Sequence, residues 1–190
     1  MKKYELTKTK YDHFGIILHR IRALRNFGDV KAGSLGGFVQ SEDNLSHDGT
    51  CWIYNNALVY LEATIKDDAK ALDECWIWNR ATLRERATAK HKCFLSGDVD
   101  VFGQAVIKDE ACCTDFSKIF YKCVVRERAG VSGKAWCHGK SELSGFSRAA
   151  GDAELTGTFK LRGNGKVFSG LHEKGIIESW SAYEVDVFHG

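Results

Sequence analysis

Apolar residues recur every six positions from Cys51 to Gly170, through twenty consecutive units with no insertion or deletion. The third residue of each unit is apolar in all twenty, and the first is Ala, Cys, Ser or Gly in eighteen. The fifth is Gly, Asp or Asn in fourteen, and these residue types tolerate positive φ at a bend. We therefore expect each unit to form a short strand followed by a corner, with its first and third residues facing inward.

A six-residue unit is too short to close a coil, so three units are expected to form one triangular coil of eighteen residues. Twenty units then make a little under seven coils, each advancing by about 4.8 Å, the spacing of parallel strands. The predicted fold class is all-β, a single-stranded parallel β-helix. The absence of proline agrees with this prediction, because most backbone N–H groups of a strand ladder must donate hydrogen bonds.

The segments that flank the hexads differ from them in pattern. Residues 1–38 are expected to form an N-terminal cap, with strands at 4–7 and 16–24 paired as a β-hairpin and turns in a glycine-rich connector at 27–38. Residues 39–170 form the predicted β-helix, because Val39 and Leu45 extend the first-position column backwards. Residues 171–190 lose the register at Glu173 and are expected to form a short C-terminal cap, with an edge strand at 183–188.

The hexads resemble those of the hexapeptide-repeat left-handed β-helix proteins, in which a large aliphatic residue points inward and a small residue stands two positions before it. Residues 26–39 and 44–54 resemble, more specifically, the YdcK-type and prophage-encoded polymer-forming hexad proteins. The resemblance implies the left hand of the coil, since parallel crossovers are otherwise right-handed. It also implies a phage or prophage origin, but no particular activity.

Composition and charge narrow the function classes. The formal net charge of the 190 residues is +2, so no overall charge draws the chain to nucleic acid or to a membrane. No apolar run is long enough for a membrane span and no signal-peptide core follows the first residues, so a soluble cytoplasmic protein is expected. The seven cysteines form no Cys-x-x-Cys pair and six fall at inward positions, so we expect buried thiols and neither a metal site nor a cofactor.

The second and fourth residues of each unit point outward in this fold, and units eighteen residues apart stack, so the sequence defines three outer faces. The first face gathers five large apolar side chains in its first coils: Leu58, Tyr60, Trp76, Trp78 and Phe94. An apolar patch of this size is rarely left in contact with water. Either a terminal segment covers it, or it binds a protein partner or a second copy of the chain, where Trp and Tyr are typical anchors.

The other two faces supply secondary candidates. The second face carries a basic column made of Lys70, Lys90, Lys108, Arg126 and Arg162. Such a column is compatible with nucleic acid or a ribonucleoprotein as the partner, whereas acidic residues at neighbouring bends favour a solvated charged face. The third face carries three aromatic residues, Phe102, Phe120 and Trp136.

Catalysis is not expected from this pattern. Acyltransferases of the family that the hexads resemble usually depend on a histidine near a loop that leaves the coil, and uninterrupted hexads contain no such loop. His91 and His138 fall in different columns, without an obvious base or orienting partner. A metal site of the carbonic-anhydrase kind would need a His-x-x-x-x-His pair, which is absent.

The leading hypothesis is a non-catalytic β-solenoid interaction module that binds, and thereby inhibits, a bacterial partner such as a defence complex. Its contact surface would be the aromatic cluster of the first face. Two alternatives stay open. One is a structural protein that assembles with itself into dimers or filaments, and the other is an acyltransferase-like enzyme that binds acyl-CoA between the subunits of a trimer.

Overall fold

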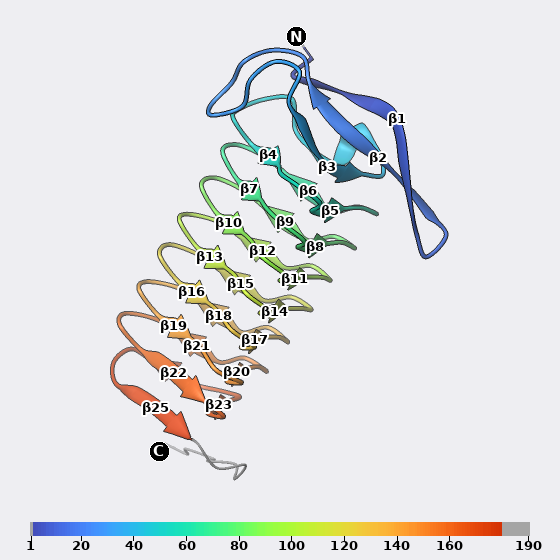
Figure 1. The fold of residues 1–190 in the computed structure, drawn as a ribbon. Helices are drawn as coiled ribbons and strands as arrows, with labels where there is room; N and C mark the ends of the chain where they lie inside the picture. Colours follow the sequence, from blue (N-terminus) through green and yellow to red (C-terminus); the bar gives the residue numbers. More distant parts are fainter. Residues whose placement is uncertain (1, 180–190) are drawn as a thin grey trace.

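The structure of the protein is a computed structural model that describes residues 2–179. Within this range the chain is all-β, apart from one 3₁₀ turn, η1 (Glu42–Asn44). The strands wind into a left-handed, single-stranded parallel β-helix of about eight coils, a long prism with three flat faces (Figure 1). The fold class predicted from the hexads is confirmed.

Each face of the prism is one parallel sheet. Face 1 consists of β3 (Leu35–Val39), β5 (Leu58–Val59), β8 (Trp76–Ile77), β11 (Phe94–Leu95), β14 (Cys112–Cys113), β17 (Gly130–Val131), β20 (Arg148–Ala149) and β23 (Lys166–Val167). Face 2 consists of β4 (Trp52–Ile53), β7 (Lys70–Ala71), β10 (Thr88–Ala89), β13 (Val106–Ile107), β16 (Val124–Val125), β19 (Glu142–Leu143), β22 (Lys160–Gly163) and β25 (Ile176–Ser179). Face 3 consists of β6 (Thr64–Ile65), β9 (Thr82–Leu83), β12 (Asp100–Val101), β15 (Lys118–Ile119), β18 (Trp136–Cys137), β21 (Glu154–Leu155) and β24 (Leu171–His172).

The core is the line of inward side chains along the axis of the prism. First- and third-position residues of successive coils stack on one another, and those of the hexads are buried. The seven cysteines are all free thiols, and six of them are buried in this column. Burial raises the pKa of the Cys113 thiol well above its ordinary value. These cysteines therefore act as small apolar residues of the core.

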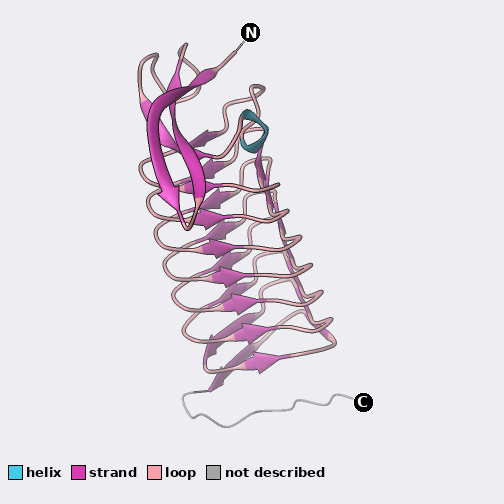
Figure 2. Cartoon of the chain, turned by 90° about the vertical axis from the view of Figure 1, so that its right-hand side faces the viewer, coloured by secondary structure: helices cyan, strands magenta, loops and turns pink. Residues whose placement is uncertain are grey.

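An N-terminal hairpin lies across the first coils. β1 (Tyr4–His13) and β2 (Ile16–Ala23) pair antiparallel around a tight turn at Phe14 and Gly15, both at positive φ. β2 also pairs antiparallel with β3, which joins the hairpin to face 1. Figure 2 shows the hairpin reaching down over the outside of the prism. β1 is six residues longer than predicted, because residues 8–13 are mostly polar and exposed and carry no apolar signal.

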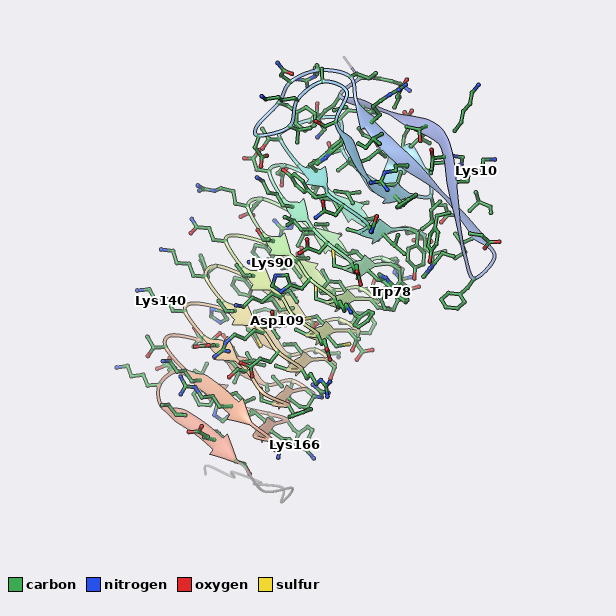
Figure 3. The ribbon with its side chains drawn as sticks, in the orientation of Figure 1. Lys10, Trp78, Lys90, Asp109, Lys140 and Lys166 are labelled. Carbon is green, nitrogen blue, oxygen red and sulfur yellow. The ribbon has the colours of Figure 1, made fainter. Side chains whose placement is uncertain are left out.

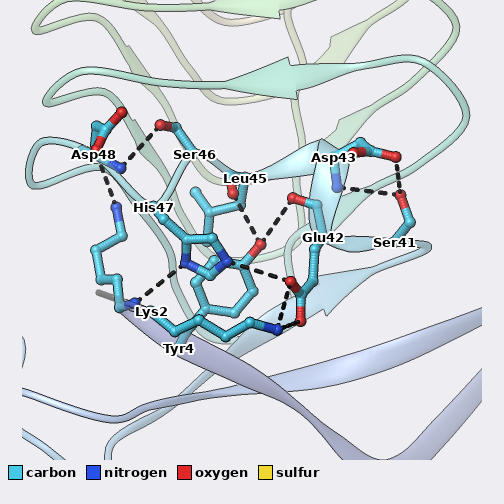
Figure 4. Close-up of polar contacts among 10 residues, drawn as sticks. Lys2, Tyr4, Ser41, Glu42, Asp43, Leu45, Ser46, His47 and Asp48 are labelled. Carbon is cyan, nitrogen blue, oxygen red and sulfur yellow. Dashed lines mark hydrogen bonds and ion pairs between the residues drawn. The ribbon is translucent and has the colours of Figure 1, made fainter.

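Buried polar contacts tie the start of the chain to the first coil (Figure 4). The fully buried Lys3 donates from Nζ to the carbonyl oxygens of Asp48 at 3.2 Å and Cys51 at 2.9 Å. The hydroxyl of Tyr4 donates to the carbonyl oxygen of Leu45 at 2.8 Å, and burial raises the pKa of this phenol. These side chains satisfy carbonyl groups at the end of the prism, where no earlier coil supplies donors.

The glycine-rich connector does more than form turns, which corrects the prediction. Gly28 and Gly33 have positive φ and belong to turns. Gly36 and Gly37, however, lie within β3. A Cβ atom on Gly36 would lie 2.6 Å from the carbonyl oxygen of Ile53. Glycine is needed there because the strand packs directly on the backbone of the first coil.

Both ends of the β-helix depart from the eighteen-residue coil. Val39 was predicted to extend the first-position column, and this is wrong. It pairs with Val59, twenty residues later, and therefore stacks on a third-position residue. At the other end, β24 pairs with β21 at a spacing of seventeen residues and β25 with β22 at sixteen. Residues 171–179 therefore continue the ladder in shortened coils. The edge strand predicted at 183–188 lies outside the described residues.

The corners give the fifth residue of each unit a second role. Positive φ is found there as predicted, for example 56° at Asn55. Within residues 2–179, the backbone N–H of this residue donates to no backbone carbonyl. At six corners it instead donates to the carboxylate eighteen residues earlier, an arrangement that we call a corner carboxylate bond. The acceptor and donor residues are Asp67 and Glu85 (2.9 Å), Asp73 and His91 (3.1 Å), Glu85 and Gly103 (3.1 Å), Asp109 and Glu127 (3.1 Å), Asp115 and Gly133 (2.9 Å), and Glu127 and Gly145 (2.7 Å).

Candidate interaction surface

The hairpin covers part of the aromatic cluster on face 1. Leu58 is 4% exposed and Tyr60 is 7% exposed, and both pack against the fully buried Leu18 of β2. Burial also raises the pKa of the Tyr60 phenol. Of the two explanations for the cluster, cover by a terminal segment therefore applies to Leu58 and Tyr60. Neither side chain can contact a partner while the hairpin is in place.

The other three members, Trp76, Trp78 and Phe94, are half-buried. The ring of Trp76 lies edge-on to His13 at 4.6 Å and to Phe94 at 5.5 Å between centroids. Trp78 is parallel to Tyr60 at 6.2 Å. Figure 3 shows Trp78 at the side of the prism below the hairpin. The rings hold one another in fixed orientations and leave part of each in contact with solvent.

The tip of the hairpin adds an exposed ring to this region. Phe14 is 88% exposed, and its ring lies 4.8 Å from that of His13, which in turn contacts Trp76. His13 is only 4% exposed, and its burial lowers the pKa of the imidazole. We call Phe14, Trp76, Trp78 and Phe94 the aromatic surface. Sequence reasoning missed Phe14 because it lies in a turn outside the hexads.

The basic column of face 2 is partly neutralised. Arg126 pairs with Glu142 at 2.7 Å and with Glu127, and these contacts raise the pKa of its guanidinium. Lys90 and Lys108 form no ion pair with any described residue. Lys90, Lys108 and Arg126 thus have unlike surroundings, which favours a solvated charged face over a continuous track for phosphates.

The aromatic residues of face 3 form a column parallel to the axis. Phe102 and Phe120 stack at 4.8 Å with 2° between their planes, and His138 continues the stack at 4.5 Å. The guanidinium of Arg84 lies 3.9 Å from the centroid of Phe102 and closes the other end. The ring faces are therefore already occupied. Trp136 is 42% exposed, and the ammonium group of Lys118 lies 5.1 Å from its ring centroid.

Comparison with known proteins bears on part of the chain. A protein of Escherichia coli (strain K12), described as "Uncharacterized acetyltransferase YdcK", is 34% identical in an alignment of 79 residues that covers 37% of this chain and 24% of that protein. The match agrees with the stacked hexads. The repeats and the stacked coils make the fold of this chain a β-helix of hexapeptide repeats. The chain spans about a quarter of the length of that relative, and no protein-family profile matches it.

Two outward histidines of this hexapeptide-repeat protein have acidic partners, which corrects the prediction that they lack them. Nδ1 of His91 lies 2.8 Å from Oδ1 of Asp109, and Nε2 of His138 lies 2.8 Å from Oε1 of Glu154. The partners were missed because they stand on the next coil. Nδ1 of His138 also lies 3.1 Å from the hydroxyl of Thr156. Both ring nitrogens of His138 are therefore hydrogen-bonded within the protein.

The hexapeptide-repeat prism offers grooves along its corners. One of about 320 Å³ follows the corner between faces 1 and 3, beside Leu61, Asn79 and Gly97. Among residues 2–179, no group of three or more His, Cys, Asp or Glu side chains is placed to hold a metal ion. No helix in the described part of the chain is long and apolar enough to cross a membrane.

Proposed function

We propose that this protein is a non-catalytic interaction module that binds another protein through the aromatic surface. The observation that carries the proposal is the exposure of Phe14 beside the half-buried Trp76, Trp78 and Phe94. Aromatic anchors already fixed by their neighbours lose little conformational freedom on binding. An aromatic surface of this kind is the usual centre of a protein–protein interface.

The rest of face 1 changes in character along the axis. Directly below Phe94 the outward positions hold small uncharged residues, namely Ser96, Cys112, Thr114, Gly130 and Ser132. Two basic residues, Arg148 and Lys166, follow on β20 and β23. No described residue favours a particular partner. Inhibition of a bacterial defence complex and a phage origin therefore stay hypotheses based on the resemblance of residues 26–54.

The proposal is tested with the double variant Trp76→Ala, Trp78→Asp. A matched control is Phe146→Asp, which places a charge on a corner residue that is 54% exposed and outside the aromatic surface. A protein enriched from bacterial cells by the wild type is purified and titrated calorimetrically against all three. We expect at least about 100-fold weaker binding by the double variant alone, the effect of two aromatic hot spots. Equal affinities of folded proteins contradict the proposal.

Self-association is measured on the same samples. Light scattering across a wide concentration range distinguishes a monomer from a dimer. A dimer that the double variant abolishes would assign the aromatic surface to a second copy of the chain. A monomer at every concentration would mean that the aromatic surface does not bind a second copy, and would favour a different protein as its partner.

An acyltransferase-like activity is the second candidate, because the Escherichia coli relative is described as an acetyltransferase. Against it stand the unbroken hexads from β4 to β23, from which no loop leaves the coil. A ligand that binds the folded state raises the thermal midpoint. A clear rise with millimolar coenzyme A or acetyl-CoA would favour the enzyme, and an unchanged midpoint would count against it.

A further inference from the structure

The corner carboxylate bonds point to sites where the same bond is missing. At the corner between faces 3 and 2, the backbone N–H groups of Tyr121 and Gly157 have no hydrogen-bond acceptor among the described residues. The residues eighteen positions earlier are Gly103 and Gly139, which have no side chain to offer. A Cβ atom on Gly103 would lie 2.7 Å from the nitrogen of Tyr121, and one on Gly139 would lie 2.7 Å from that of Gly157. At that distance a Cβ atom would clash, so the preceding coil places no side chain beside either N–H.

Lysines stand along this corner, and Glu173 lies on the coil after Gly157. Lys122 and Lys140 follow the fifth positions of this corner, and neither forms an ion pair with any part of the chain that the structure describes. Figure 3 shows Lys140 extending away from the prism. Glu85, the acidic residue one coil before Gly103, is already paired with Arg84 at 2.9 Å. The local field therefore attracts an anion.

A shallow groove runs beside the first of the two N–H groups. It measures about 140 Å³ and is lined by Glu85, Arg86, Gly103, Gln104, Tyr121 and Lys122. The Tyr121 side chain itself is 63% exposed. The donor is therefore accessible from outside the molecule, unlike the donors of the strand ladder.

We infer that this corner binds the carboxylate groups of an acidic protein segment, one at the Tyr121 N–H and one at the Gly157 N–H. The six internal bonds show that an N–H in this position takes an Asp or Glu oxygen at 2.7 to 3.1 Å. The two donors are two coils apart, about 9.6 Å, which a few residues of extended chain span. Lys122 and Lys140 add charge attraction. The site lies apart from the aromatic surface, so either proposal can fail alone.

The test uses the ¹⁵N-labelled full chain and amide chemical shifts. The protein is titrated with a hexaglutamate peptide, and with hexaglutamine as the uncharged control. We expect the Tyr121 and Gly157 amide signals to shift saturably with hexaglutamate only. The Gly133 amide signal should not shift, because its N–H already donates to the Asp115 carboxylate. Absence of these shifts, or equal shifts with both peptides, overturns the inference. A larger response to an oligophosphate of equal charge would overturn it in favour of nucleic acid.

The decisive variant is Gly139→Asp, which should recreate the corner carboxylate bond to the Gly157 N–H. Aspartate adopts this φ elsewhere in the fold, as Asp67 at φ 60° and Asp115 at φ 62° show, although the neighbouring coil must shift to admit a Cβ atom 2.7 Å from the Gly157 nitrogen. The Gly157 signal should stop responding to hexaglutamate while the Tyr121 signal still responds. Affinity should fall about tenfold, the effect of one lost hydrogen bond to a charged group.

A matched control separates this effect from the added charge. Gly133→Asp makes the same substitution on the corner between faces 1 and 3, where the new Cβ would lie 2.8 Å from the nitrogen of Gly151. It should retain the full affinity, and equal loss in both variants overturns the inference. If Gly139→Asp does not fold, Lys122→Gln with Lys140→Gln replaces it. Several-fold weaker binding is then expected, and unchanged affinity overturns the site.

Discussion

Asp109 allows the corner carboxylate bond to be measured by itself. Its Oδ2 accepts the Glu127 N–H at 3.1 Å, its Oδ1 lies 2.8 Å from Nδ1 of His91, and its φ is 64°. Asp109→Gly removes the acceptor but keeps a residue suited to positive φ. Asp109→Ala removes the same acceptor and adds the strain of a Cβ atom in the left-handed region.

The expected magnitudes follow from these contacts. A hydrogen bond contributes about 1 kcal/mol to the free energy of unfolding, and more when one group is charged. Because the Asp109 side chain is 34% exposed, solvent weakens the interaction. We expect a loss of about 1 kcal/mol for Asp109→Gly and about 2 kcal/mol for Asp109→Ala. Each kcal/mol lowers the thermal midpoint by about 2–4 °C in a chain of this size.

Thermal unfolding followed by circular dichroism measures the loss of stability in both variants. Repeating the measurement as a function of pH gives an independent test. Partial burial raises the pKa of Asp109, but the hydrogen bond from Glu127 and the contact with His91 outweigh it and hold the pKa below that of an ordinary carboxyl group. A lowered pKa stabilises the fold above the ordinary value of about 4, and this contribution is lost as the pH falls through the folded value. The difference between wild type and Asp109→Gly should therefore shrink in acid. A glycine variant as stable as wild type at pH 7, or an alanine variant more stable than the glycine variant, would refute the reasoning.

Two further predictions concern the N-terminal region. Gly36→Ala should cost about 1–3 kcal/mol, seen as a lower thermal midpoint, because the added Cβ would lie 2.6 Å from the Ile53 carbonyl oxygen. His13 has a lowered pKa, so the neutral imidazole stabilises the hairpin and this contribution is lost as the pH falls below about 6.5, the ordinary histidine value. Tryptophan fluorescence should report a change around Trp76 in that range, and the same titration of His13→Gln should be flat if the reasoning holds.

The regular coils could be predicted in detail because their signal is local and repeated. Once the inward columns were recognised, the spacing of eighteen residues placed Trp76 beside Leu58 and Phe94, as the structure has them. Positive φ at the corners followed from residue type alone. The prism and its three faces were therefore predictable from the sequence alone.

Features that depend on contacts between unlike segments could not be predicted. The two extra residues in the first coil shift Val39 to another column without changing the apolar pattern. The cover over Leu58 and Tyr60 comes from Leu18 of β2, a strand that the sequence predicts but whose place over face 1 no local pattern gives. The acidic partner of His138 stands sixteen residues away, at a distance that the hexad count does not single out.

The pairing of β2 with β3 also limits how copies of the molecule can stack. It occupies the outer edge of β3, so face 1 offers that edge to no other chain at the N-terminal end. The outer strand, β1, carries Lys8 and Lys10, and lysines on an edge discourage pairing. A filament needs two complementary ends on every subunit. End-to-end contact on this face would have to join the C-terminal ends of two copies, and growth would stop at a closed pair.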